Sequence, residues 1–276
     1  MSKSVPFSVS MCVYGGDNPI WFQSAVDSIL NQTAPPSEVV LVVDGPVPEA
    51  LDAVIRKHEE NPVFHVIRFE ENQGHGNARR AGLAACQNDL VAIMDADDIS
   101  TPSRFEKQLA VFAHDPSLSI VGGNIDEFIG TAENVVAKRI VPSQDEEIKA
   151  YMKQRCPMNQ MTVMFRKNAV DSVGGYVDWY CDEDYYLWLR MALAQMKFAN
   201  INDTLVYVRV GEEMYQRRGG IKYFKSEAKL QKYMRKNKII GFGTYFSNVS
   251  KRLIVQVLLP NRLRGWVFKK FARKKV

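Results

Sequence analysis

Short apolar runs alternate with segments of helical periodicity through the first third of this 276-residue sequence, and this alternation is its strongest constraint on folding. The run Glu38–Val43 is apolar at almost every position, as expected of a strand buried on both faces of a parallel sheet. Strand, helix, strand, helix is the pattern of an open, doubly wound α/β sheet. The predicted strands are 8–14, 38–43, 64–69 and 90–94, separated by helices over 21–32, over 48–60 and up to Cys86.

Aromatic or acidic side chains stand where three of these strands end. Tyr14 closes the first run, Asp44 follows the second, and Asp95-Ala96-Asp97-Asp98 follows Leu90–Met94. In open α/β sheets, ligands bind in the crevice beyond the carboxyl ends of the strands. The sequence therefore predicts one ligand site at that edge, with these side chains around it.

The acidic cluster after Met94 needs positive charge nearby. Three carboxylates within four residues repel one another unless a cation lies among them. Mg²⁺ and Mn²⁺ prefer hard oxygen ligands, commonly one or two carboxylates together with substrate phosphates. We therefore expect a divalent metal, Mn²⁺ or Mg²⁺, and a phosphate-bearing ligand. The alternative is that Asp98 caps a helix opening at Pro102.

The segment Asn72–Arg80 is predicted to be a loop that leads into a helix. Its glycines permit tight turns, and Arg79 or Arg80 could pair with a phosphate. The alternative is an ordinary turn followed by two solvated arginines. The sequence alone does not separate these two interpretations.

A second acidic segment, Asp182-Glu183-Asp184, opens a helix predicted over residues 182–194. One of these acids could be a general base that takes the proton of an acceptor hydroxyl. The alternative is that they only complement the helix dipole. No histidine follows His114, which excludes a histidine-based site in the second half of the chain.

The order of these segments resembles the inverting glycosyltransferases of family 2. The resemblance covers residues 5 to about 215, and within the family it is nearest the amylovoran-type group of bacterial capsule, exopolysaccharide and lipopolysaccharide enzymes. The matching pieces are Val9–Tyr14, Ser28–Thr33, Glu38–Gly45, Asn72–Gly74 with Ala78 and Arg79, Met94–Asp98, and Glu183–Arg190.

This resemblance implies a GT-A fold, a Rossmann-like α/β architecture with a mostly parallel, mixed sheet and here a C-terminal helical extension. It implies transfer of a hexosyl or N-acetylhexosaminyl unit from a nucleotide-diphosphate donor, a UDP-sugar being favoured. In the donor site, Tyr14 would stack on the base, Asp44 would hydrogen-bond to it, and Arg79 would lie near the base or phosphates. Asp95 would bind the ribose, and Asp97 would ligate the metal that bridges the diphosphate.

For the acceptor side, the resemblance implies that Asp184 is the base, with Glu183 as the neighbour that could take its place. The acceptor would be a saccharide or a lipid-linked glycan in cell-surface polysaccharide synthesis. No Q-x-x-R-W motif follows, which indicates a non-processive enzyme. Many relatives carry two acids where this chain has Val43-Asp44, so the contact with the nucleotide's base would rest on Asp44 alone. In place of a late histidine, Arg217 and Arg218 could contact the diphosphate.

Charge and composition bear on location and partners. The net charge is +5, and the segment from Arg252 to Lys275 contains eight basic and no acidic residues among apolar ones. A basic amphipathic helix suits an anionic membrane surface, although docking on the body is the alternative. We expect a glycosyltransferase domain over 1–215 and a basic helical tail over 216–276. With no export signal and four cysteines in no paired spacing, we expect a cytoplasmic protein peripheral to the inner face of the plasma membrane.

Two other functions compete with glycosyl transfer. A nucleotidyltransferase acting on a sugar phosphate also uses acidic pairs on a doubly wound sheet. It should carry a cationic glycine-rich loop after the first strand, and Gly15-Gly16-Asp17 has no cation. A non-catalytic basic protein that binds membranes or nucleic acid is the second alternative. The absence of an RNA-binding or helix-turn-helix signature argues against nucleic acid as a partner.

Overall fold

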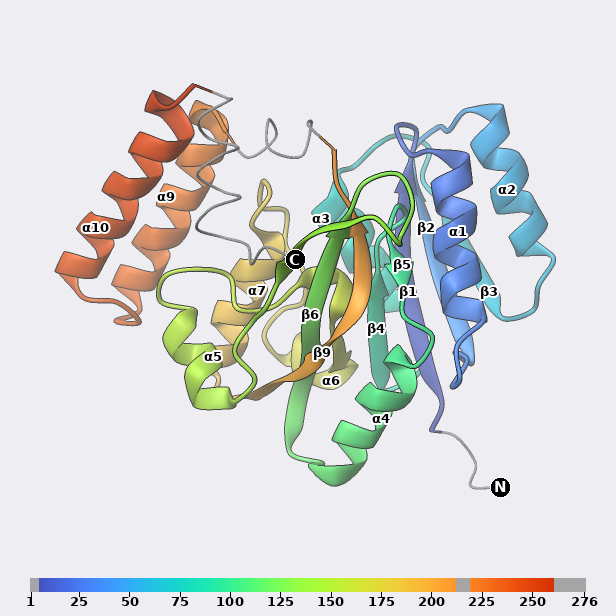
Figure 1. Ribbon diagram of the computed structural model, residues 1–276, viewed down its shortest axis with the longest axis horizontal. Coiled ribbons are helices and arrows are strands. Elements are labelled where there is room, and N and C mark those ends of the chain that lie inside the picture. Colours follow the sequence, from blue (N-terminus) through green and yellow to red (C-terminus); the bar gives the residue numbers. More distant parts are fainter. Residues whose placement is uncertain (1–4, 212–218, 261–276) are drawn as a thin grey trace.

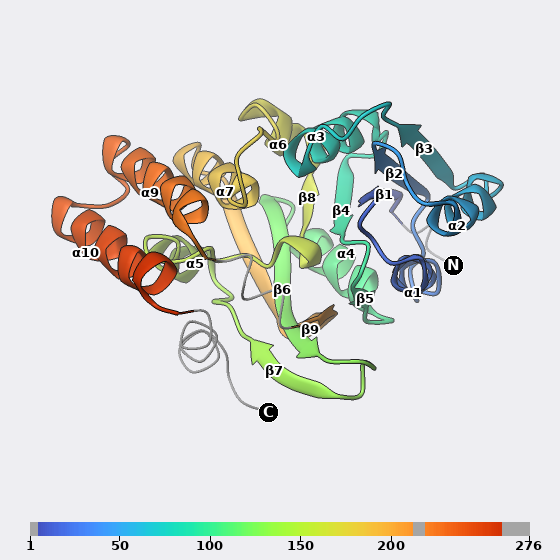
Figure 2. The same ribbon diagram turned by 90° about the horizontal axis from the view of Figure 1, so that it is seen from above.

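The computed structural model describes residues 5–211 and 219–260, which form one mixed sheet with helices on both faces (Figure 1, Figure 2). The strands are β1 Phe7–Tyr14, β2 Glu38–Asp44, β3 Phe64–Arg68, β4 Leu90–Met94, β5 Ile99–Ser100, β6 Leu118–Phe128, β7 Val135–Arg139, β8 Met164–Arg166 and β9 Lys197–Arg209. The α-helices are α1 Pro19–Leu30, α2 Glu49–Glu59, α3 His75–Ala85, α4 Arg104–His114, α5 Asp145–Tyr151, α6 Lys167–Ser172, α7 Glu183–Leu193, α9 Ile221–Lys236 and α10 Phe242–Leu253. A 3-10 turn covers Gln160–Thr162, and a π-helical turn covers Ile254–Leu258.

The strand order is β3-β2-β1-β4-β8-β6-β9-β5, with β7 paired to β6. Strands β1 to β4 pair in parallel, as predicted from the alternation with helices, whereas β8 is antiparallel to both β4 and β6. Strand β6 pairs in parallel with β9. The mostly parallel, mixed sheet confirms the predicted fold class, and the four N-terminal strands lie within a residue or two of their predicted bounds.

Each face of the sheet has its own core, and the alternation of side chains along β2 shows why. Val39, Leu41 and Val43 point into a core that α1, α2 and α4 cover, and Val40 points into the opposite core. The second core is covered by α3, α5, α6, α7 and α9, and its members from α9 include Leu230 and Met234. A strand buried on both faces has no polar side to expose, which explains the continuous apolar run.

Helices α9 and α10 lie side by side at the end of the molecule farthest from α1 and α2 (Figure 1, Figure 2). Their pairing leaves Arg252 near Glu227, with which it forms an ion pair, and Arg252 also donates to the carbonyl of Gln154 at 2.9 Å. Arg252, the first cation of the basic segment Arg252–Lys275, thus docks on the body. The other basic residues of that segment, and the predicted domain boundary between 215 and 216, lie outside the described residues. That boundary stays a prediction.

Candidate active site

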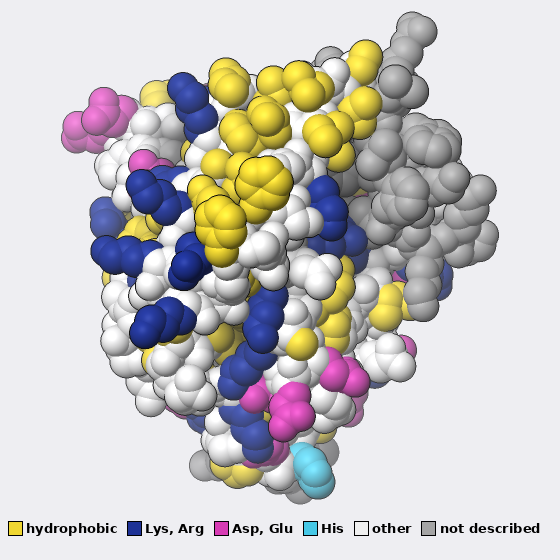
Figure 3. Space-filling view, turned by 90° about the vertical axis from the view of Figure 1, so that its left-hand side faces the viewer, with side chains coloured by type: hydrophobic (Ala, Val, Ile, Leu, Met, Phe, Trp, Pro, Cys, Tyr) yellow, Lys and Arg dark blue, Asp and Glu magenta, His cyan; other side chains and the backbone are white. Residues whose placement is uncertain are grey.

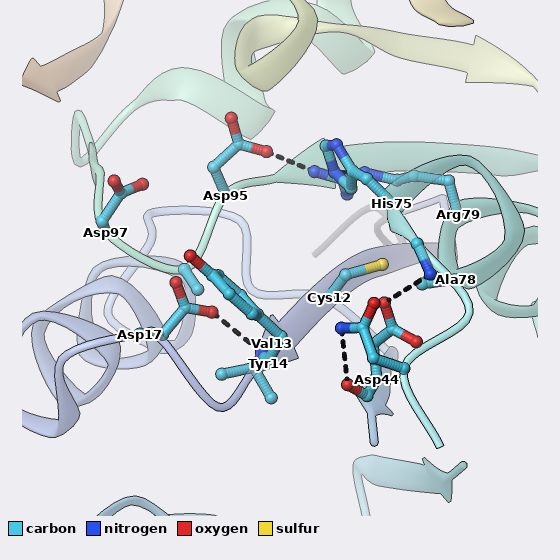
Figure 4. Close-up of a pocket in the computed structure, with 13 residues that line it drawn as sticks. Cys12, Val13, Tyr14, Asp17, Asp44, His75, Ala78, Arg79, Asp95 and Asp97 are labelled. Atoms are coloured by element: carbon cyan, nitrogen blue, oxygen red, sulfur yellow. Dashed lines mark hydrogen bonds and ion pairs between the residues drawn. The ribbon is translucent and has the colours of Figure 1, made fainter. Parts of the chain in front are cut away.

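A pocket of about 400 Å³ lies at the carboxyl ends of β1, β2 and β4 (Figure 4). Parallel register places Tyr14 opposite Asp44, and β4 on the other side of β1 delivers Asp95. The structure therefore brings together the strand-end residues that the sequence predicted. The lining residues are Cys12, Val13, Tyr14, Asp17, Asp44, Asn72, Gly74, His75, Ala78, Arg79, Asp95, Ala96 and Asp97.

Tyr14 and Asp44 form one side of this pocket. Tyr14 is 43% exposed, so its ring offers an open face, while its backbone amide donates to Asp17 at 2.9 Å. Asp44 is buried, and its two carboxylate oxygens accept from the backbone amides of Gln73 and Gly74 at 2.7 and 3.0 Å. Asp44 therefore holds the loop before α3 against the end of β2. Carboxylate oxygens have several lone pairs, which leaves acceptor capacity for a ligand.

Arg79 is buried under the pocket rather than extended into it. Its guanidinium donates to the imidazole of His75 at 3.0 Å and to the backbone carbonyl of Ser10 at 3.2 Å, and it forms an ion pair with Asp95. This arrangement excludes the alternative of a solvated Arg79. Arg80, by contrast, is exposed. The pairing of Arg79 with Asp95 fixes the orientation of the Asp95 carboxylate at the pocket wall.

The three acids of the strand-end cluster have different surroundings. Burial, together with the charges of Asp95 and Asp17, raises the pKa of Asp97 to about 6. Asp98 is buried and accepts from the backbone amide of Arg209 at 2.9 Å. The expectation that Asp98 could cap the next helix is wrong. That helix begins at Arg104, after an N-cap of Ser103, and Asp98 instead secures the end of β9.

The residues around Asp97 fit a divalent cation. Its carboxylate is a hard oxygen ligand in surroundings with excess negative charge, because Asp95 and Asp17 are nearby. Within the described residues, no group of three or more histidine, cysteine or acidic side chains is arranged to hold a metal by itself. One carboxylate completed by substrate phosphates is the usual arrangement for Mg²⁺.

The second acidic segment adjoins the pocket through His75. Glu183 is nearly buried, and its carboxylate lies 3.1 Å from Nδ1 of His75. Burial raises the pKa of Asp184 to about 7, and the neighbouring charge of Glu183 adds to this rise. Asp182 is the N-cap residue of α7 but makes no side-chain capping bond. Glu183 and Asp184 lie in the first turn of α7, as the helix-dipole alternative also requires, so a base among these acids stays a prediction.

Two pocket residues, Asp17 and His75, were not predicted as site residues. Asp17 follows the tight turn after β1, where its link to Tyr14 depends on local backbone geometry. His75 stands in the predicted loop, but its partners are distant in sequence. Both could have been found only as polar residues next to the predicted strand ends. Arg217 and Arg218 lie outside the described residues, so their contact with a diphosphate stays a prediction.

An acidic pocket at the carboxyl ends of parallel strands, beside an exposed aromatic ring, has the features of a nucleotide-binding site. Comparison with solved structures gives the GT-A fold. Residues 1–349 of S. aureus TarS in complex with UDP match with a TM-score of 0.61 at 16% identity, covering 95% of this chain and 78% of that one. The mannosyltransferase PcManGT from Pyrobaculum calidifontis, in complex with GDP-Man and Mn²⁺, also matches with a TM-score of 0.61 at 16% identity, over 95% of this chain and 72% of its own.

The sequence relatives are glycosyltransferases. An uncharacterized glycosyltransferase of Haemophilus influenzae is 38% identical over 97% of this chain and 99% of its own. The UDP-Gal:alpha-D-GlcNAc-diphosphoundecaprenol beta-1,3-galactosyltransferase of Escherichia coli is 36% identical over 99% of both chains. The amylovoran biosynthesis glycosyltransferase AmsE of Erwinia amylovora is 36% identical over 87% of this chain and 90% of its own.

The profile of glycosyl transferase family 2 matches residues 8–174, and the chain belongs to this family. The protein is a glycosyltransferase, as the ordered motifs predicted. Neither the nucleotidyltransferase nor the non-catalytic binding protein finds support in these comparisons.

Proposed function

We propose that this glycosyltransferase moves a sugar from a UDP-sugar to a hydroxyl of a lipid-linked or glycan acceptor, with inversion, in cell-surface polysaccharide synthesis. The observation that carries the proposal is the pocket at the ends of β1, β2 and β4, where Tyr14, Asp44, Asp95 and Asp97 meet. Relatives that act on a diphosphoundecaprenol-linked sugar and in amylovoran synthesis support the acceptor class.

In this proposal, Tyr14 and Asp44 hold the base of the nucleotide. The exposed ring of Tyr14 provides the stacking surface, and Asp44 accepts a hydrogen bond from the base. Asp95, held by Arg79, accepts hydrogen bonds from the ribose hydroxyls. Asp97 ligates Mn²⁺ or Mg²⁺, and a bound metal supplies charge neutralisation for the leaving diphosphate.

Asp184 acts as the general base. Asp182 and Glu183, directly before it, lie in different electrostatic surroundings. A pKa of about 7 leaves Asp184 able to take a proton near neutral pH, which suits a general base. The acceptor hydroxyl gives its proton to the Asp184 carboxylate while its oxygen forms the new bond to the anomeric carbon. The bond from that carbon to the diphosphate breaks, and the nucleoside diphosphate leaves with the electron pair. Attack opposite the leaving group inverts the anomeric configuration.

The end of the molecule formed by α9 and α10 supports a peripheral membrane location. Apolar side chains gather on the upper part of this face, with lysines and arginines beside and below them (Figure 3). Lysines of α9 at helical spacing are exposed, and so is an apolar row on α10 and the π turn. The lysines are Lys222, Lys225, Lys229, Lys232 and Lys236, and the apolar residues are Phe242, Phe246, Leu253, Ile254 and Leu258.

Such a face suits an anionic bilayer, because apolar side chains enter the headgroup region while cations attract anionic lipids. A lipid-linked acceptor would be available there. Across residues 5–211 and 219–260, no helix is both long enough and apolar enough to span a membrane. We therefore propose surface contact at the inner face of the plasma membrane through the face of α9 and α10.

A thermal-shift titration with UDP-sugars, with and without Mn²⁺, tests the donor site. Metal-dependent stabilisation of the wild type is expected, since a ligand that binds only the folded state raises its stability. The variant Asp97→Asn should lose the metal-dependent part. Glu60→Gln, an exposed acid at the end of α2, serves as the control and should keep it. If no nucleotide sugar stabilises the wild type in a metal-dependent way, the proposed donor site is wrong.

A further inference from the structure

Four side chains form a continuous path from the proposed donor site to the proposed base. Asp95 pairs with Arg79, Arg79 donates through Nε to Nε2 of His75 at 3.0 Å, and Nδ1 of His75 lies 3.1 Å from Oε1 of Glu183. Figure 4 shows His75 beside Arg79 at the pocket. The path joins Asp95, directly after the end of β4, to the first residue of α7.

The donors and acceptors along this path determine which nitrogen of a neutral His75 ring carries the proton. Arginine can only donate, so Nε2 of His75 must carry a lone pair where it faces Arg79. The proton of the neutral ring is then on Nδ1, directed at the Glu183 carboxylate. Burial by itself would raise the pKa of Glu183, but its hydrogen bond and electrostatic interaction with His75, aided by its backbone and Arg79, hold it below the usual value.

Burial and close packing make it costly for Arg79 or Glu183 to lose its contact with His75. Arg79 is 1% exposed and Glu183 is 8% exposed, so neither can replace its partner with bulk water at little cost. Helix α3 also approaches the segment before α7 closely, because a Cβ added at Gly76 would lie 2.9 Å from the backbone oxygen of Val177. Without the imidazole, the Glu183 carboxylate would lose its hydrogen-bond partner beside the half-buried Asp184.

We propose that His75 is a positioning residue that fixes Glu183 as an ionised carboxylate and thereby holds the start of α7, with Asp184, in register with the donor pocket. The inference rests on the proposed role of Asp184. In this account Glu183 has a structural role and transfers no proton. His75 touches neither the transferred sugar nor the acceptor hydroxyl in this account. Without His75, Arg79 would still pair with Asp95 and donate to the Ser10 carbonyl, so the loss of His75 acts on turnover and not on donor affinity.

Two conservative variants separate the two contacts of His75. In His75→Asn, the amide nitrogen takes roughly the place of Nδ1 and keeps a donor for Glu183. In His75→Gln, the amide oxygen reaches roughly the place of Nε2 and keeps an acceptor for Arg79. His75→Ala removes both contacts. His65→Ala, at an exposed histidine of β3, is the matched control.

The expected result is a fall in kcat of about tenfold or more for His75→Ala and His75→Gln, with partial recovery in His75→Asn. The dissociation constant for UDP and the KM for the donor should stay within about threefold of the wild type in all variants, and His65→Ala should match the wild type throughout. Equal losses in His75→Asn and His75→Gln, or unchanged kcat in His75→Ala, would overturn the inference.

A measurement without turnover separates this inference from the proposed function. The His75 resonance in the ¹⁵N spectrum of the full chain at pH 7.5 is assigned by its loss in His75→Gln. In the neutral form of the ring, the proton should be on Nδ1. A proton on Nε2 would contradict the contact with Arg79 and overturn the inference even if the enzyme is active. The Nδ1 tautomer in a chain that transfers no sugar would instead sustain the contact and refute the proposed function.

Discussion

Asp182, Glu183 and Asp184 are consecutive acids with three different electrostatic surroundings. His75 lowers the pKa of Glu183 against the opposing effect of burial. Burial raises the pKa of Asp184 to about 7 and that of Asp182 to about 8, and Glu227 adds to the rise at Asp182. A sequence pattern shows three acids at a helix start, whereas their partners come from α3 and α9. The assignment of separate roles therefore required the structure.

The proposed base predicts how turnover depends on pH. Asp184 can accept a proton only when it is ionised, so kcat should rise as the pH increases through about 7 and then level off. Asp184→Asn should lower kcat by about 10²–10⁴-fold with little change in the donor KM. Steady-state rates between pH 5.5 and 9 at saturating donor would show both effects. A flat pH profile in the wild type, or near-normal turnover in Asp184→Asn, would contradict this role.

Asp182 predicts an effect on stability that is independent of catalysis. Its pKa is raised in the folded state, so the folded chain carries an unfavourable buried charge above about pH 8, and protonation removes this cost as the pH falls. Asp182→Asn should therefore stabilise the fold by of the order of 2 kcal/mol at pH 8.5. The gain should vanish below about pH 4, where the carboxyl is protonated in both states. Urea unfolding at the two pH values measures it, and an equal effect at both would refute the explanation.

At the scale of elements, the turn after β2 organises the donor pocket. Gly45 adopts a φ of +84°, and a Cβ there would lie 2.5 Å from the backbone nitrogen of Asn72. This close approach lets Asp44 accept from the amides of Gln73 and Gly74 and so place the start of α3. The loop geometry and the position of Arg79 thus depend on one turn.

Gly45→Ala should destabilise the fold by about 2 kcal/mol or more, because it adds a backbone clash to the strain of a left-handed conformation. This substitution should also weaken UDP binding, because displacement of the loop before α3 would move Arg79 of α3 away from Asp95. Gly130→Ala separates the two effects: Gly130 has a φ of +76° with no atom near the added Cβ, so only the strain applies. Equal destabilisation and unchanged UDP affinity in both variants would show that the close approach has no role.

The parallel half of the sheet could be predicted from sequence because each strand is a short apolar run between helices. The strand order of the second half could not be predicted, because it depends on pairing between segments distant in sequence. Strand β9, for example, pairs in parallel along β6, and β8 lies antiparallel between β4 and β6. The pocket followed from strand ends alone. The path through His75 did not, because it depends on how closely α3 and α7 pack.

At the scale of the whole molecule, the donor pocket and the α9–α10 face belong to one packed body. Leu230, Met234 and Ile240 join the same core as Val40 and residues of α7. Helix α9 is therefore anchored beneath its exposed lysines, and contact of this face with a surface would hold the body in one orientation. This arrangement supports the proposed membrane contact through α9 and α10.

The double variant Phe242→Ser/Phe246→Ser should reduce binding to vesicles containing anionic phosphatidylglycerol by at least about tenfold, because two exposed aromatic side chains are removed from the interface. Val136→Ser/Ile140→Ser, which removes exposed apolar side chains at β7, is the control and should bind as the wild type does. Co-sedimentation measures both. Equal binding by all three proteins would show that α10 is not the membrane-facing helix.

The most direct test of the account is the stereochemistry and cofactor dependence of transfer. The full chain is incubated with UDP-sugars and a diphosphate-linked lipid acceptor, with Mn²⁺ or with a chelator, and the product is analysed by NMR. The account predicts a new glycosidic bond with inverted anomeric configuration, formed with Mn²⁺ and lost in Asp97→Asn and Asp184→Asn. A product with retained configuration, or transfer that is equally fast with the chelator and in both variants, would contradict it.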